Sequence, residues 1–401
     1  MRPRIVTFCA AALVLGITTG TIPAHATSES TPTKESAKST TTKTATRFAG
    51  VPLISDVAGK ADVTDPKLVN PWGLAMGKTL WVSNAGTGSA TVYSGGAGLI
   101  TKEKTEVTIP GGTPTGQVFN GGEGFEIHSK GASGPAQFIF ASPSGAISGW
   151  NAEVDPKNAI ISAFTRYADY KGLAMMPTNR GNFLLAADFA HNRIDVFDED
   201  FRRVRMSRSA FRDRALPSSY SAFNVEIVGS AVYIAYAKRD ARTGKSIAGK
   251  GLGFISRFSA TGRFLGRVAA RGALNAPWAM IEAPAGFGQY AGALLVGNFG
   301  NGWINAWDRR TGRFLGPLRG TNGKPLAWEG LWDLERGTAA SGGENAIWFS
   351  AGVQKAQHGL VGLIMPSNAA NTTPRPSSSP TAPQPKPSSD SNNNSNNDSG
   401  Y

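Results

Sequence analysis

The side chains best suited to chemistry in this 401-residue chain are a scattered set of charged, amide and aromatic residues. Lys171 and Glu329 could orient an ionised group of a ligand, and His191 or His358 could move a proton. The chain has no HExxH, GxSxG or clustered-histidine motif beside them. These residues therefore indicate a binding site more readily than a defined reaction.

Two tryptophans and one acid extend this set, and each has a structural interpretation as well. Trp72 and Trp278 could stack against a sugar or another flat ligand, but each follows a proline, and packing between sheets is favoured over ligand contact. Lys171 and Asp188 fall in one repeat at adjoining strand ends, so they could simply pair with each other.

The elements that must position these side chains are internal repeats. The hexapeptide TGRFLG occurs at residues 261–266 and again at 311–316, and LLVGNFGNGWINAWD at 294–308 matches LLAADFAHNRIDVFD at 184–198. Related segments start at residues 80, 138, 184, 232, 294 and 347. A sheet-only repeat of this length and number is typical of a propeller. We predict an all-β, six-bladed β-propeller with four-stranded blades, in which TGRFLG is a turn that leads into the outermost strand of two adjacent blades.

The last repeat predicts how the ring closes. Residues 328–366 contain enough sequence for only three strands, whereas residues 48–56 form a strand-like segment before the first repeat. We expect this N-terminal strand to complete the last blade by pairing beside residues 359–365. Such pairing would remove the exposed edge that an open sheet carries.

The propeller geometry gathers the candidate residues at one mouth of the channel. In each blade the start of the first strand and the end of the second strand face the same mouth. The first ring is predicted to hold Trp72, Thr115, Lys171, Asn224, Trp278 and Glu329, and the second Asn84, Ser142, Asp188, Tyr236, Asn298 and Ala351. With two histidines from nearby loops, the predicted ligand-binding set is Trp72, Asn84, Lys171, Asp188, Asn224, Trp278, Asn298, Glu329, His191 and His358. The members of this set that end strands, Asn84, Asp188 and Asn298, could equally satisfy the backbone of turns.

The segments outside the repeats predict export. Residues 1–26 have the basic start, short apolar run and Ala-His-Ala end of a secretory signal peptide. Residues 27–46 and 367–401 are rich in Ser, Thr, Lys, Pro and Asn, which predicts disordered linkers on either side of a propeller at 47–366. No second apolar run is long enough to span a membrane. The single cysteine, Cys9, would leave with the signal peptide, so no disulfide or thiol chemistry is expected.

The positive charge of the chain indicates what kind of partner it could bind but does not identify one. The formal net charge is +13, and an arginine-rich stretch covers residues 202–208. Solvated surface arginines are favoured over a nucleic-acid site, because no aromatic residue interleaves them. The expected partner is an unknown extracellular ligand or a component of the cell envelope, bound by a monomeric, secreted protein.

Several motifs resemble an uncharacterised family of secreted bacterial proteins. They include NPWGLA at 70–75, YKGLA at 170–174, LNAPWAM at 274–280 and QHGL at 357–360, and the resemblance covers residues 47–366. It implies a six-bladed propeller of the NHL and calcium-dependent phosphotriesterase type, without an assigned activity. The wider lactonase and phosphotriesterase propellers hold a divalent ion at the channel mouth with a Glu and several Asn or Asp residues.

Two functions follow as hypotheses. The favoured one is a non-enzymatic binding module without a cofactor. The alternative is a divalent-metal-dependent hydrolase of the lactonase or phosphotriesterase type, with Ca²⁺ as a candidate ion. The ion would be held by some of Glu329, Asn224, Asp188, Asn84 and Asn298, of which Glu329, Asn224 and Asp188 are the first candidates. Lys171 would compete with the ion for the same carboxylates. A glycan-hydrolysing site would need paired carboxylates, for which only Asp188 and Glu329 qualify, and it is not favoured.

Overall fold

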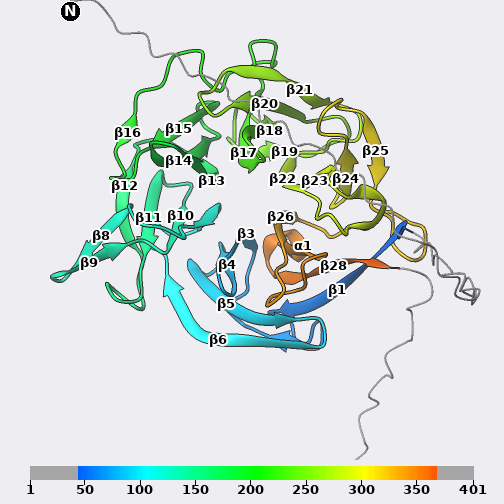
Figure 1. Ribbon diagram of the computed structural model, residues 1–401, viewed down its shortest axis with the longest axis horizontal. Coiled ribbons are helices and arrows are strands. Elements are labelled where there is room, and N and C mark those ends of the chain that lie inside the picture. Colours follow the sequence, from blue (N-terminus) through cyan, green and yellow to red (C-terminus); the bar gives the residue numbers. More distant parts are fainter. Residues whose placement is uncertain (1–43, 368–401) are drawn as a thin grey trace, which may run out of the picture. The chain divides into compact units, whose positions relative to one another are not determined.

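The computed structural model describes residues 44–367, so the predicted signal peptide and almost all of the two predicted linkers lie outside the described residues. Within this range almost all of the regular secondary structure is β-strand. Figure 1 shows its sheets arranged in a ring around a central axis. No helix in residues 44–367 has the length and apolar character needed to cross a membrane. Ala45, inside the predicted linker, already accepts a hydrogen bond from the backbone N–H of Gln289 at 2.9 Å.

The first three blades follow the chain from the channel outward. Blade 1 consists of β3 (Pro71–Met76), β4 (Leu80–Asn84), β5 (Ser89–Gly96) and β6 (Leu99–Thr108). Blade 2 consists of β7 (Gln117–Phe119), β10 (Phe138–Ala141), β11 (Ala146–Trp150) and β12 (Ile160–Phe164), with a separate hairpin of β8 (Glu126–Ser129) and β9 (Ala132–Pro135). Blade 3 consists of β13 (Tyr170–Thr178), β14 (Gly181–Asp188), β15 (Arg193–Phe197) and β16 (Arg203–Val204).

The remaining blades repeat this order. Blade 4 consists of β17 (Tyr220–Val228), β18 (Ala231–Arg239), β20 (Phe254–Ser259) and β21 (Phe264–Ala270), and β19 (Ser246–Ile247) pairs with β18. Blade 5 consists of β22 (Pro277–Glu282), β23 (Leu294–Asn298), β24 (Ile304–Trp307) and β25 (Phe314–Pro317), with the 3-10 turn η1 (Gly288–Tyr290). Blade 6 contains β26 (Leu331–Arg336), β27 (Ile347–Ala351), the one-turn α1 (Val353–Ala356) and β28 (Leu360–Ser367). The prediction of six four-stranded blades is confirmed.

The N-terminal strand completes blade 6, as the strand count predicted. β1 (Arg47–Ser55) pairs antiparallel with β28, from Arg47 opposite Ser367 to Ser55 opposite Leu360, and β2 (Val63–Thr64) adds a parallel edge. Figure 1 shows the blue β1 beside the orange-red β28. The hydroxyl of Ser55 donates to the carbonyl of Gly359 at 2.9 Å across 304 residues of sequence. The last sheet therefore takes its outer strand from the front of the described chain.

The repeated hexapeptide forms the predicted turn and outer strand. Gly262 and Gly312 occupy the turns with φ of +82° and +72°, a region that favours glycine. β21 and β25 follow as the outermost strands of blades 4 and 5. The pairing then skips Leu265 in one blade and Leu315 in the other, so both copies form a bulge at the same position. The same six residues are repeated because they make the same local structure twice.

The second strands of the blades are among the most deeply buried elements of the fold. β4, β10, β23 and β27 are buried along their whole length. A strand in the middle of a blade packs against the neighbouring blade on either face, so both sets of alternating side chains are removed from water. This explains why the repeats carry near-continuous apolar runs such as LLVGN rather than a polar alternation.

We call β1, the strand that closes the ring, the clasp. Replacing its residue Phe48 by alanine should destabilise the whole propeller. The Phe48 ring is fully buried and stacks on Phe287 with a centroid separation of 4.8 Å. Loss of a buried phenylalanine costs about 3–5 kcal/mol, and here it also loosens the strand that closes the ring. Urea denaturation of Phe48→Ala should show this loss, whereas exposed Thr46→Ala should stay within about 0.5 kcal/mol of wild type. A Phe48→Ala loss below about 1 kcal/mol would mean that the clasp does not limit stability.

Candidate functional site

Five of the six inner strands are irregular at the same level of the channel. The pairing with the second strand shifts register early in β3, β13, β17, β22 and β26. A bulge bends its strand and turns a side chain out of the regular alternation. The residues at these shifts are Trp72, Lys171, Phe223, Trp278 and Trp332.

The three tryptophans at this level pack together and fill the channel. The ring centroid of Trp72 lies 3.6 Å from that of Trp332, and the Trp278 ring lies 6.2 Å from each. They are only 7%, 4% and 2% exposed for Trp72, Trp332 and Trp278. The indole N–H of Trp278 in blade 5 donates to the carbonyl of Lys171 in blade 3 at 3.1 Å. We call Trp72, Trp278 and Trp332 the tryptophan plug.

The observed register corrects the predicted first ring at two positions. In the ladder with the second strand, Phe223 and Trp332 stand where the repeat alignment placed Asn224 and Glu329. The cause is an offset of the repeat alignment, by one residue in β17 (224 − 223) and by three residues at β26 (332 − 329), because β3, β13 and β22 carry similar shifts and their residues were placed correctly. Asn224 lies beside the plug and donates to the carbonyl of Trp278 at 3.0 Å. Glu329 is exposed in the loop before β26.

Glu329 has a structural role in that loop. Its carboxylate accepts the backbone N–H groups of Gln354 and Lys355 at 3.3 and 3.0 Å. These two residues have left-handed φ values of +52° and +57° inside α1, which points their N–H groups to one side. A carboxylate held by such a concave turn is a common way of stabilising it.

Three residues of the predicted second ring are buried and make hydrogen bonds to nearby protein groups. Asn84, Asp188 and Asn298 are fully buried. The amide of Asn84 donates to Thr91 Oγ1 at 2.9 Å, and Asn298 accepts from the N–H of Asn275 at 3.1 Å. These hydrogen bonds agree with the alternative interpretation from the sequence, in which the polar residues at the strand ends stabilise local structure.

Asp188 is the centre of a charged network in blade 3. It accepts from the N–H groups of Asp169 and Ala190, both at 3.1 Å, and pairs with His191 Nδ1 at 2.7 Å and with Arg193 at 3.1 Å. Lys171 pairs with Asp169 at 2.8 Å, so the Lys171–Asp188 pair considered from the sequence does not form.

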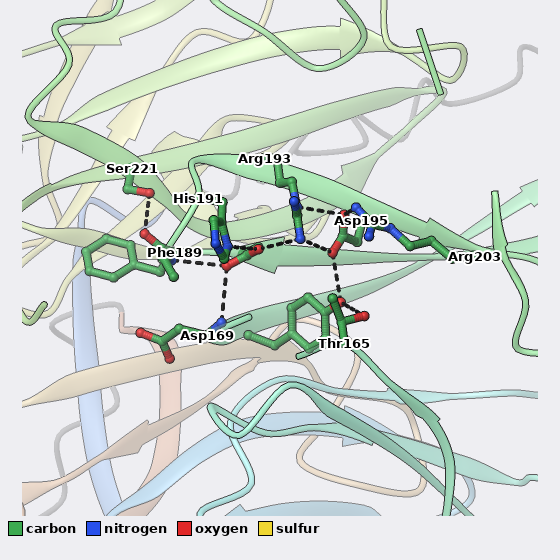
Figure 2. A network of polar contacts seen from close by, with 11 residues as sticks. Thr165, Asp169, Phe189, His191, Arg193, Asp195, Arg203 and Ser221 are labelled. Atoms are coloured by element: carbon green, nitrogen blue, oxygen red, sulfur yellow. Dashed lines mark hydrogen bonds and ion pairs between the residues drawn. The ribbon is translucent and has the colours of Figure 1, made fainter. Parts of the chain in front are cut away.

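The network continues outward along β15, as Figure 2 shows for His191, Arg193, Asp195 and Arg203. Asp195 pairs with Arg193 at 2.9 Å and with Arg203, and it accepts from the hydroxyl of Tyr170 at 2.8 Å. The buried carboxylates of blade 3 are therefore balanced by arginines of the same sheet, an arrangement that supports the structure.

The residues proposed for a divalent ion do not fit one in this arrangement. The two oxygens of Asp188 already face a histidine, an arginine and two backbone donors. Asn224 uses its carbonyl oxygen on the N–H of Val225 at 2.9 Å, and Glu329 uses both oxygens on α1. No hydrogen bond or ion pair joins these three residues within the described chain. A hard cation would have to displace bonds at each of them.

Four residues of the predicted set remain accessible at the plugged mouth. Lys171 and His358 are partly exposed, and Glu329 and His191 are exposed. His358 Nδ1 lies 2.7 Å from Asp56, beside the clasp. A ligand-binding role for these four residues stays a prediction.

A second feature of the channel lies beyond the plug and was not predicted. A cavity of about 300 Å³ is lined by residues of all six inner strands, and Trp278 forms part of its wall. Three carboxyl side chains face it, Glu226 from β17 and Asp333 and Glu335 from β26. No lysine or arginine of the described residues lines it. We call this cavity the acidic chamber.

The environment of the acidic chamber holds protons on its carboxyls. Burial, followed by the charges of Asp333 and Glu335, raises the pKa of Glu226 well above its usual range. Burial raises the pKa of Asp333 to about 7, although the N–H groups of Leu74 and Leu334 each donate to its carboxylate at 2.7 Å. Burial, followed by the charge of Asp333, raises the pKa of Glu335 to about 8. The chamber therefore favours a positive charge, either a shared proton or a cation.

A sequence signal for the chamber exists. Glu226, Asp333 and Glu335 are acids within inner strands, and buried strand positions rarely carry an acid unless it is paired. Asp333 and Glu335 are two residues apart, the spacing of one face of a strand. The signal was missed because only the starts of these strands were compared.

Comparisons with known proteins give a family without an activity. The chain is 34% identical over 323 residues to the uncharacterised protein R648 of Acanthamoeba polyphaga mimivirus, and the alignment covers 78% of each protein. It is 35% identical over 324 residues to protein L690 of the same virus, covering 78% of this chain and 84% of the viral protein. The chain belongs to the family of these uncharacterised proteins. No known family model matches it. The relatives are viral, so the resemblance to a bacterial family stays a prediction.

The similar solved structures share the fold at a distance. They include hydrazine synthase of Kuenenia stuttgartiensis, with a TM-score of 0.43, 16% identity, and 73% of this chain and 76% of that chain covered. Virginiamycin B lyase from Staphylococcus aureus gives a TM-score of 0.39 and 12% identity over 76% of this chain and 81% of that chain. Similarity at this level carries no argument about function.

Replacing Trp278 by alanine should measure the structural weight of the plug. The change removes a buried indole and its bond across the channel, so the free energy of unfolding should fall by about 3–5 kcal/mol. Trp303, which is 38% exposed, is the matched control, and Trp303→Ala should cost less than about 1 kcal/mol in the same urea titration. A near-wild-type melt for Trp278→Ala would instead identify Trp278 as a surface for ligands.

The acidic chamber should make stability fall as the pH rises. Asp333 and Glu335 have folded-state pKa values above their unfolded values, so their contribution is complete below about pH 4 and is lost as the pH passes about 7 to 8. The free energy of unfolding should drop by about 2 kcal/mol between pH 5 and pH 9, allowing for solvent screening at the channel wall. Glu335→Gln should flatten this slope, whereas Glu344→Gln, at an exposed turn, should leave it unchanged. Equal slopes in wild type and Glu335→Gln would contradict the shift.

Proposed function

We propose that this protein is an exported, non-catalytic binding module that takes a positively charged group of its ligand into the acidic chamber. The observation that carries the proposal is the gathering of Glu226, Asp333 and Glu335 around one cavity with no basic side chain in its described wall. A bound cation would relieve the repulsion among these carboxyls and allow them to ionise. Export rests on the signal-like residues 1–26.

The size and lining of the chamber favour an organic cation. Its volume of about 300 Å³ matches the lower end of small-molecule sites, about 300–1,000 Å³. Leu74, Met76 and Met175 line it together with the acids. An alkylammonium or guanidinium group suits this combination, because its methylene groups can contact apolar side chains while its charge meets the carboxyls.

The non-catalytic assignment is supported by the use of the polar groups at the other mouth. The tryptophan plug lies there, and Asp188 and Asn298 use their polar atoms on protein partners. We therefore propose that the ligand binds in the acidic chamber, at the opposite end of the channel from the mouth that the sequence predicted. The predicted role of one channel mouth in binding is retained.

Binding of a small diamine should test this function. Wild-type protein titrated calorimetrically with cadaverine should bind more tightly at pH 9 than at pH 6, because Asp333 and Glu335 lose their protons in this interval. Cadaverine keeps most of its charge, since aliphatic amines have a pKa of about 10.4. Glu226→Gln combined with Glu335→Gln should weaken binding at pH 9 by at least about tenfold, or about 1.4 kcal/mol.

The control separates the chamber from general surface charge. Glu123→Gln combined with Glu126→Gln removes the same formal charge from two exposed positions at the start of the β8–β9 hairpin and should leave the affinity for cadaverine unchanged. An equal loss in both double variants, or an affinity independent of pH, would rule the chamber out as the site.

A further inference from the structure

The loop at residues 205–219 crosses from the outer strand of blade 3 to the inner strand of blade 4 with alternating burial. Phe211 and Asp213 are buried, while Arg212 and Arg214 are exposed. Neither arginine has a hydrogen-bond or ion-pair partner within the described chain. Because Phe211 and Asp213 are buried, the loop is anchored to the protein while the guanidinium groups of Arg212 and Arg214 stay on its outer side.

The buried residues fix this loop on blade 4. The N–H of Phe211 donates to the carbonyl of Gly262 at 2.9 Å, and the Phe211 ring meets Phe258 edge-on at 6.0 Å. The carboxylate of Asp213 accepts from Ser256 at 2.9 Å and from Arg267 at 2.6 Å. Arg267 therefore neutralises Asp213, and the charge that remains on the loop is positive.

A cavity of about 440 Å³ lies beside this loop and contains a buried hydroxyl without a partner. Its polar lining consists of Arg212, Arg214, Asn192, Ser218, Tyr236 and Asp213, whose carboxylate is paired with Arg267. Tyr236 is 2% exposed, and its hydroxyl makes no hydrogen bond to any described residue. Burial raises the pKa of this phenol, so it keeps its proton and remains a donor at neutral pH. Buried hydroxyls nearly always have a partner, so the lone donor indicates a ligand atom.

We propose that this cavity binds the oxyanion of a phosphate or sulfate ester, with the Tyr236 hydroxyl donating to one oxygen and Arg212 and Arg214 pairing with the others. Guanidinium groups suit such anions because their N–H groups can meet two oxygens at once. The site lies in the joint between blades 3 and 4 and prefers the opposite charge to the acidic chamber, so it does not depend on the function proposed for the channel.

A larger cavity on the same loop allows two sources for this group. About 710 Å³ in volume, it shares Arg212 and Arg214 with the first cavity and adds Arg263 and Arg267. A small ester would use the first cavity alone. An anionic polymer would continue along the second cavity and contact Arg263, which is exposed.

The test uses the full chain with inorganic phosphate and with dextran sulfate as probes, at constant ionic strength. Tyr236→Phe should weaken phosphate binding at least fivefold with an unchanged or higher melting temperature, because the ring stays and only an unpaired donor is lost. Arg212→Gln combined with Arg214→Gln should weaken both probes at least tenfold. Arg310→Gln combined with Arg313→Gln, at the exposed TGRFLG turn of blade 5, is the charge-matched control and should change neither.

The possible results distinguish a polymeric ligand from a small ester and show which result would refute the site. If Arg263→Gln weakens dextran sulfate but not phosphate, the site serves a polymer; if it weakens neither, the site serves a small ester. Unchanged binding in Tyr236→Phe and in the double variant would overturn the proposal. An equal loss in the blade 5 control would overturn it as well, because the effect would then be one of net charge.

Discussion

The ladder between β1 and β28 is the constraint on which the rest of the molecule depends. Five blades are built from strands that follow one another in sequence, but blade 6 needs a strand from the opposite end of the described chain. The entropy of closing so long a loop grows only with the logarithm of its length, so distance in sequence is a small obstacle. Because the ring is closed, the inner strands of all six blades face one central axis.

The tryptophan plug is possible only because that axis is shared. Trp72, Trp278 and Trp332 come from blades 1, 5 and 6, and the bulges in their strands turn them toward one another. The plug divides the channel into two unlike ends. On one side polar side chains bond to neighbouring protein groups, and on the other three acids line one cavity, where burial raises their pKa values.

Much of the fold was predictable from the sequence because repeats and strand counts are local. TGRFLG fixed two outer strands, and the missing strand of the last repeat identified 48–56 as the clasp. The site was less predictable. Short segments align in more than one register, so Asn224 was placed in the ring instead of Phe223, one residue off, and Glu329 instead of Trp332, three residues off. Tyr236 was placed in the second ring, and the cavity that it lines depends on a loop from another blade.

The clasp also sets an order of events during synthesis. β1 is made among the first described strands and β28 is the last, so most of β1 stays unpaired until residues 360–367 exist, although β2 can join its end earlier. At ribosomal rates of 5–20 residues per second, the nascent chain carries that unpaired strand for on the order of 15–60 s. Blades 1 to 5 can form hairpin by hairpin during this time, since their strands are neighbours in sequence. The wheel itself can only be finished after translation has passed its last blade.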